Sequence, residues 1–303
     1  MATFDRTTIV RGPCKVTYGG QTFYSKGGVK LTVGNATFDK ETDAYGIVGK
    51  AKTDFTITVE FTPVGEIEAL TVLFPYGNTA IGASLATASD VRLVIVSSDK
   101  TYTILSAFVT GVPSVSLSSQ KTAFGAVTFT GVLKKGGDPA VIGDYYTIGA
   151  GASIGTAFDP TKIVTAPYTA TLAGTIGPFY SVGGFEIAFD MTANDVMVDG
   201  IGLVDKTFGG IGCTITCDPA GVAQDVFETF FDALDSGEEL ASSSLDISTT
   251  TTGGLNFDCA AVQVLNLERN FDPAANRLGV LTLAAKRTFS TGAQQALYTI
   301  AAV

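Results

Sequence analysis

Hydrophobic and polar residues alternate along several short stretches of this chain. In residues 55–61 the apolar side chains occupy the odd positions, and Thr56, Thr58 and Glu60 occupy the even ones. A period of two residues is typical of a β-strand with one buried face. Similar patterns predict strands at 91–96, 101–109, 126–132, 211–217, 257–265 and 280–284. The chain is therefore expected to be mainly β.

Two cysteines lie on the apolar side of one predicted strand. In residues 211–217, Cys213 and Cys217 take the places that Ile57 and Phe61 hold in residues 55–61. Four residues along a strand span roughly 13 Å, which is too far for a disulfide bond. We therefore predict free thiols that pack as small hydrophobic groups, as expected for a chain made in the reducing cytoplasm.

The sequence repeats itself with an offset of 156 residues. Residues 23–31, FYSKGGVKL, return as residues 179–187, FYSVGGFEI, and the alignment continues without a gap to residue 74. Farther along the chain the offset becomes 154. The pattern predicts a tandem duplication, with repeat 1 at 1–137, a Gly- and Pro-rich linker at 138–159 and repeat 2 at 160–303.

Each repeat is predicted to carry one short helix directly after its alternating strand. Thr62-Pro63 and Asp218-Pro219 place an N-cap residue before a proline at the first helical position. Between Val222 and Leu234 the apolar residues then follow a helical spacing. The expected fold is two tandem β-sandwich or barrel domains, each with one short flanking α-helix.

Long acidic loops are predicted at residues 34–50 and 190–206. They have the same length in both repeats and carry apolar side chains that a solvated loop would not favour. We expect them to be contact surfaces. The residues predicted to make these contacts are Phe38, Asp39, Glu41, Asp43, Tyr45, Ile47, Met191, Asp195, Met197, Asp199 and Ile201.

The composition argues against several classes of function. A net charge of −10 disfavours sequence-independent binding to nucleic acids or anionic membranes. Because the chain has no histidine, Ser-His-Asp, Cys-His and His-ligated metal sites lack their central residue. No apolar run is long enough to span a membrane, so the 46% of hydrophobic residues predict subunit interfaces.

Two patterns have the form of functional motifs but lack necessary residues. Residues 151–155, GASIG, fit the G-x-S-x-G pattern, yet they lie in the predicted linker and no histidine can act as the base. Asp39, Glu41 and Asp43 alternate as cation ligands can, without the glycine and glutamate of an EF-hand loop. We predict no catalytic residue, no cofactor and no metal.

The layout of each repeat resembles the major tail tube protein of long-tailed bacteriophages. The resemblance rests on a strand entered through Phe-Tyr-Ser-x-Gly-Gly, a long acidic loop, a Gly-x-Val-x-Lys return, the alternating strand and a helix that begins at proline. It implies tail-tube-like domains, six of which close into a ring around a channel. A chain with two such domains would form homotrimeric rings.

The resemblance also implies roles for the predicted surfaces. The long loops would contact neighbouring rings in the stacked tube, and Thr56, Thr58, Glu60, Thr214 and Thr216 would face the lumen. Viral DNA would pass without specific binding, and no membrane would be involved. The implied partners are further copies of the chain and the tail terminator, tape measure and tail-tip proteins, and the implied location is the virion tail.

Other readings of the sequence stay open. A neck or tail-terminator protein, or a capsid-decorating or adhesin-like β-sandwich protein, would have a similar composition. An enzyme would have to work with carboxylates alone, as glycosidases do, and the chain has no tryptophan to hold a sugar.

Overall fold

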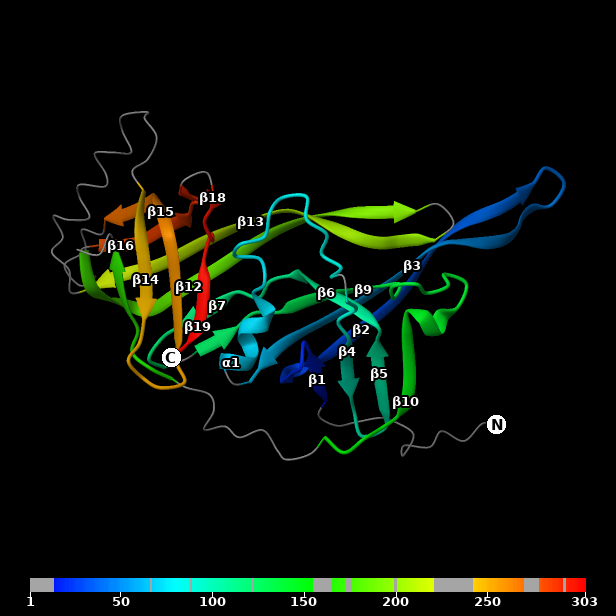
Figure 1. Ribbon diagram of the computed structural model, residues 1–303, viewed down its shortest axis with the longest axis horizontal. Coiled ribbons are helices and arrows are strands. Elements are labelled where there is room, and N and C mark those ends of the chain that lie inside the picture. Colours follow the sequence, from blue (N-terminus) through cyan, green and yellow to red (C-terminus); the bar gives the residue numbers. More distant parts are fainter. Residues whose placement is uncertain are drawn as a thin grey trace.

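The computed structural model describes residues 14–65, 67–87, 89–120, 122–154, 165–172, 176–198, 201–220, 242–269, 278–290 and 293–303. In this part of the chain almost all regular structure is antiparallel β, which confirms the prediction of a mainly β fold (Figure 1). Each predicted strand is present, and most extend beyond the predicted ends.

The first sheet forms a closed circuit of strands. Its strands are β1 Lys15–Tyr18, β2 Gln21–Thr42, β3 Gly46–Val64, β4 Leu93–Val96, β5 Lys100–Ile104, β6 Ser106–Gly111, β9 Val127–Val132 and β10 Tyr146–Ala150. The order is β10-β5-β4-β1-β2-β3-β9-β6, and β5 runs into β6 through Leu105 alone. Because β5 and β6 are one bent segment, the circuit closes, and β10 is added on the free edge of β5.

The second sheet repeats this arrangement. Its strands are β11 Thr169–Leu172, β12 Ile176–Val198, β13 Gly202–Ala220, β14 Ser242–Ser248, β15 Leu255–Arg269, β16 Leu278–Ala285 and β19 Thr299–Ala302. The order β11-β14-β15-β16-β13-β12 closes through a further pairing of β11 with β12, and β19 is added on β15 as β10 is on β5. The short strands β17 Phe289–Ser290 and β18 Ala293–Gln294 form a separate hairpin.

Strand pairing also joins the two units. The β6–β9 hairpin continues into β7 Val115–Leu117 and β8 Thr122–Phe124, and β7 pairs with β12 of the second sheet. The base of this hairpin therefore belongs to one sheet and its end to the other. One continuous hydrophobic core runs through both units.

The prediction of long loops is wrong, because these segments are mostly strands. β2 and β3 form one long hairpin that turns at residues 43–45, and β12 and β13 form its counterpart. Asp39 lies opposite Lys50, and Asp195 lies opposite Lys206. In a two-stranded ribbon the inward-facing backbone groups of each strand pair with the other and water can satisfy the outward-facing ones, so charged side chains can point to solvent on both faces without a core.

The helix predicted to begin at Pro63 is also wrong. Pro63 lies in β3 opposite Ser25, near the end of the strand and beyond the last residue of β3 that pairs with β9, which is a position where a strand tolerates proline. Helical structure follows only as a single turn, α1 Ile67–Leu70, extended by the 3-10 turn η2 Thr71–Leu73. Pro219 likewise lies in β13. The predicted helix between Val222 and Leu234 lies outside the described residues.

Part of the predicted linker belongs to the first sheet. Residues 138–154 include the 3-10 turn η3 Ile142–Asp144 and β10, which pairs along its whole length with β5. Asp144 Oδ1 and Lys134 Nζ form an ion pair at 2.5 Å, which fixes the turn before β10. The Gly and Pro residues of 138–154 therefore lie within a folded unit, although the sequence reads them as a connection. The G-x-S-x-G pattern accordingly begins directly after a strand.

The cysteines lie where the alternation predicts. Cys213 and Cys217 are buried on the core side of β13, and Cys259 is buried on β15. All described cysteines are free thiols. Burial raises the pKa of the Cys217 thiol to about 12, and a hydrogen bond with Cys259 together with burial raises the pKa of Cys213. These thiols are packing groups.

Candidate assembly surfaces

A polar face follows the middle of the first sheet. On β3, Thr56 and Thr58 are half-buried and Glu60 is exposed, whereas the residues between them are fully buried. Thr58 lies opposite Thr32 of β2, and Glu60 lies opposite Lys30 at an ion-pair distance of 3.8 Å. Both charged side chains are solvated, so this pair adds little stability. The face is polar and partly exposed to solvent.

The second sheet carries the matching face. Thr214 and Thr216 of β13 are half-buried and lie opposite Ala188 and the exposed Glu186 of β12. Ser116 of β7 lies opposite Glu186 on its other side. Because β7 continues from the first unit, the threonine-rich face extends across the joint between the two sheets. The predicted lumen residues therefore all lie on the polar sides of their strands.

The two long hairpins match residue for residue. Tyr24 pairs with Val64 and Tyr180 with Ala220, and at the tips Thr42 pairs with Gly46 and Val198 with Gly202. Each of these pairs is related to its counterpart by the offset of 156. The ion pair between Lys50 and Asp39 recurs between Lys206 and Asp195. Identical registers place aligned residues in equivalent positions on the two hairpins.

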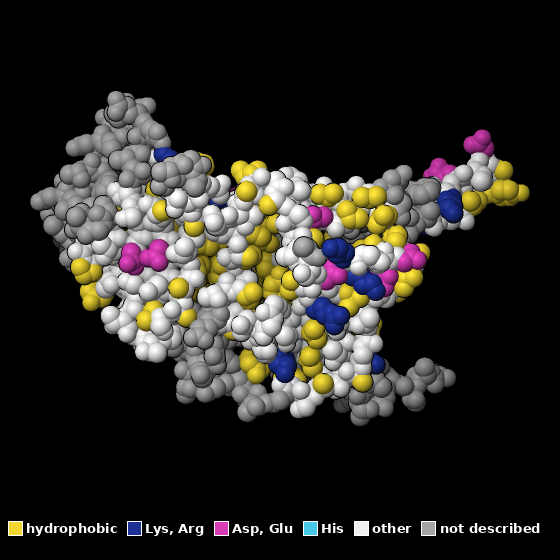
Figure 2. Space-filling model, viewed as in Figure 1, with side chains coloured by type: hydrophobic (Ala, Val, Ile, Leu, Met, Phe, Trp, Pro, Cys, Tyr) yellow, Lys and Arg dark blue, Asp and Glu magenta, His cyan; other side chains and the backbone are white. Residues whose placement is uncertain are grey.

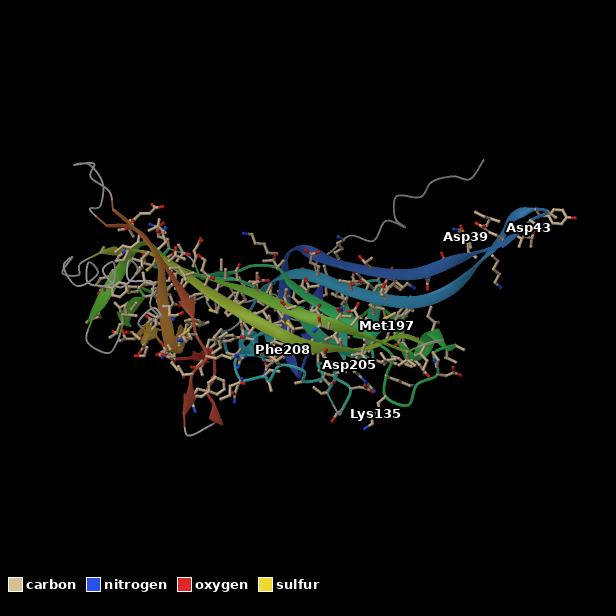
Figure 3. All side chains as sticks on the ribbon, turned by 90° about the horizontal axis from the view of Figure 1, so that it is seen from above. Asp39, Asp43, Lys135, Met197, Asp205 and Phe208 are labelled. Carbon is tan, nitrogen blue, oxygen red and sulfur yellow. The ribbon has the colours of Figure 1, made fainter. Side chains whose placement is uncertain are left out.

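The tip of the first hairpin projects away from the rest of the molecule. Figure 3 shows Asp39 and Asp43 at this free end, and Figure 2 shows apolar and acidic side chains gathered on it. Tyr45 is 84% exposed and Ile47 is 56% exposed, while Glu41 and Asp43 are also exposed and Asp39 is half-buried. Phe38 pairs with Ala51 in the ribbon, but its side chain lies outside the described residues.

The second hairpin instead lies against the first unit. Tyr145, which precedes β10, donates a hydrogen bond to the carbonyl of Ile201 at 3.4 Å, and the neighbouring Leu203 is only 4% exposed. Met191 packs on the core of its own chain, which makes it a poor contact residue for another molecule. Met197 stays 53% exposed, and Asp195 is exposed. Asp199 lies outside the described residues.

A segment after α1 holds the second hairpin in this position. Gly82 donates to the Phe208 carbonyl at 2.7 Å, Phe208 donates back to Ala83 at 2.8 Å, and Leu85 donates to Lys206 at 2.8 Å. The ring of Phe208 stacks on Tyr76 with centroids 5.4 Å apart. Sequence reasoning missed this contact and the β7–β12 pairing. For β7 a signal existed, since the alternation continues at Val115 and Leu117 beyond the predicted strand.

Among the described residues, no group of three or more Cys, Asp or Glu side chains could hold a metal ion. In the same part of the chain, no helix has the length and apolar character needed to cross a membrane. No protein-family model matches the sequence, and comparison with curated proteins gives no match.

Proposed function

We propose that this chain is a structural subunit that assembles into stacked rings and forms the hollow tube of a phage tail. The observation that carries the proposal is the repetition of one closed strand circuit, with the first circuit extending a hairpin onto the second. When one unit binds a similar unit through two different surfaces, the same head-to-tail contact can be repeated from unit to unit. The series closes into a ring if the rotation between successive units permits it. The resemblance of the sequence to tail tube proteins supplies the six-unit ring.

Three chains would then complete one ring. The two units of a chain would each fill one sixth of it, with alternating contacts within and between chains. Such closure would remove exposed strand edges, which a mainly β protein must otherwise protect from indiscriminate pairing. The apolar side chains that a single chain leaves exposed would be covered in the assembly.

The threonine-rich face would line the channel. Glu60, Glu186 and Asp190 all lie on this face, and Lys30, which also lies on it, is paired with Glu60. Threonine hydroxyls add no cation that could hold phosphate groups. DNA would therefore pass along the wall without being retained. The chain would need no cofactor or metal for this role, and we propose no enzymatic activity.

Contacts between rings would use the parts of the hairpin tips that ring closure leaves free. Met197 and Val198 stay exposed although the second hairpin already lies on the first unit. Their aligned positions on the first hairpin are Glu41 and Thr42. The tail terminator, tape measure and tail-tip proteins would bind at the ends and in the channel of the stack, and the assembly would reside in the virion tail.

Electron microscopy of the purified protein tests the proposal directly. We expect rings or tubes with a central channel, and a ring mass equal to three chains. Rings of six chains with the second unit pointing outward would overturn the trimer. A protein that remains monomeric at all concentrations would overturn the assembly itself.

The lumen assignment has its own test. Glu60→Lys should leave tubes intact but slow or block DNA passage, and Thr58→Lys should act in the same direction. Asp99→Lys is the matched control, because it makes the same charge change as Glu60→Lys at the exposed β4–β5 turn. Labelling of Glu60→Cys by a bulky reagent from the outside of intact tubes would contradict the assignment.

A further inference from the structure

We infer that the open edge of the first hairpin, at Val29–Leu31 and at the tip around Ile47, binds the second unit of another copy of this chain. The contact would repeat the one by which the second hairpin holds the first unit within a single chain. The inference deepens the proposed function, since it names the surface through which rings would close.

The first observation is a difference between two glycines in the same conformation. Gly28 and Gly184 occupy aligned positions, and each has a φ of +98°. A Cβ atom on Gly184 would lie 2.3 Å from the carbonyl oxygen of Leu117, because β7 lies directly against it. A Cβ atom on Gly28 would meet nothing within 4 Å. The position that is filled on the second hairpin is empty on the first.

The space around these glycines also differs. A hollow of about 160 Å³ remains beside Gly184, where residues 117–120 form part of its wall. A hollow of about 380 Å³ beside Gly28 is lined by β2 and β3 together with Ala126, and no segment equivalent to β7 contributes to its wall.

The second observation is an unpaired strand edge. Phe185–Ile187 of β12 pair with β13 on one side and with β7 on the other. The aligned residues Val29–Leu31 pair with β3 on one side, and in the described part of the chain no strand pairs with their other side. An extended segment could add to this edge through main-chain hydrogen bonds.

The third observation concerns the far half of the same hairpin. Leu203, which is 4% exposed, aligns with Ile47, which is 56% exposed. Lys206 accepts a backbone hydrogen bond from Leu85, whereas the aligned Lys50 is exposed and has no such partner among the described residues. These contacts on the second hairpin thus have aligned positions on the first that are exposed.

These aligned positions identify the occupant. The second hairpin is covered by the first unit of the same chain. By the same alignment, the first hairpin should be covered by a second unit. The chain's own second unit is already engaged with the first unit through its hairpin. A second copy therefore supplies the contact, head to tail.

Hydrogen exchange and sedimentation together test the inference. In dilute, monomeric protein the outward-facing amides of Val29–Leu31 should exchange quickly, whereas those of Phe185–Ile187 should be protected. As the concentration rises and complexes form, Val29–Leu31 should become protected at least tenfold. Complexes that form without protection at Val29–Leu31 would overturn the inference.

A pair of neighbouring glycine variants supplies the control. Gly28→Ala should weaken association at least tenfold, because its methyl group would meet the added strand. Gly27→Ala places alanine at a similar φ of +85°, but its aligned position, Gly183, has nothing within 4 Å even with β7 in place. Gly27→Ala should therefore associate as the wild type does. Equal association of both variants and the wild type would overturn the inference.

The outcomes separate this inference from the proposed function. Rings or tubes that form with an unprotected β2 edge would refute the inference and leave the proposed function standing. Open filaments with a protected edge would support the inference and refute the ring. Monomers at every concentration would refute both.

Discussion

Gly184→Ala should weaken the packing of β7 against β12, which joins the two units. Gly28→Ala is the control that measures the cost of the backbone strain alone. Both glycines have a φ of +98°, so alanine strains the backbone equally at the two positions, by about 1–3 kcal/mol. Only at Gly184 does the new methyl group collide with a neighbouring strand. Its nearest atoms would be the carbonyl oxygen of Leu117 at 2.3 Å and Cβ of Ser118 at 2.6 Å.

The additional loss of stability in Gly184→Ala depends on whether β7 detaches from β12 or only shifts. Detaching β7 would expose Val115 and Leu117, both fully buried, at a cost of roughly 1.5–3 kcal/mol for each side chain. Shifting the strand is cheaper, since overpacking of this kind typically costs about 1–3 kcal/mol. We therefore expect Gly184→Ala to destabilise the chain by about 1–3 kcal/mol more than Gly28→Ala does.

Urea unfolding of dilute protein, followed by circular dichroism, measures this difference. With a slope of about 3 kcal/mol per molar urea, the two midpoints should differ by about 0.3–1 M. Hydrogen exchange should show faster exchange at residues 115–117 in Gly184→Ala alone. Equal midpoints for the two variants would show that β7 does not press on Gly184, and the reasoning would fail.

Three further predictions concern other parts of the chain. Burial, and then the like charge of Asp246 directly opposite, raise the pKa of the Asp258 carboxyl, so the folded state resists its ionisation. Asp258→Asn should therefore stabilise the fold at pH 7 by roughly 0.2–1 kcal/mol. This gain should shrink as the pH falls through the folded pKa towards the unfolded value near 3.9, because the wild-type carboxyl is then protonated as well. Urea unfolding at several pH values measures it. In native protein at pH 8 a thiol reagent should label half-buried Cys14 and leave the three buried cysteines unlabelled until urea is added; rapid labelling of all four would contradict their burial. Replacing residues 39–50 by Asn-Gly, which joins two paired positions through a tight turn, should leave folded protein that forms no tubes, and tubes of normal length would contradict a role for the tip.

The strands and their buried faces could be predicted from the sequence. Burial on one side of a strand needs an apolar residue at every second position, and the pattern at 55–61 and 211–217 is therefore visible without knowledge of any partner. The same rule identified Cys213 and Cys217 as core residues. It also separated Thr56, Thr58 and Glu60 from the core, which is the polar face of the candidate site.

Predictions that rested on single residues rather than on a period failed. Thr62-Pro63 has the composition of a helix start, but proline is equally acceptable in a strand where no neighbour needs its N–H. The charged residues between 34 and 50 suggest a loop, but an exposed two-stranded ribbon tolerates them because neither of its faces is buried. Local composition does not distinguish these cases, since the difference lies in what the backbone groups pair with.

The sequence by itself determined that this protein is mainly β, that its two halves share one pattern and that Cys213 and Cys217 are buried. Only the tertiary structure decided that one hairpin lies on the first unit while its aligned counterpart projects freely. Gly28 and Gly184, or Ile47 and Leu203, have matching sequence contexts and opposite surroundings. The physical reason is that periodicity reports which side of a strand avoids water, whereas the segment that covers an edge or a tip comes from a distant part of the chain.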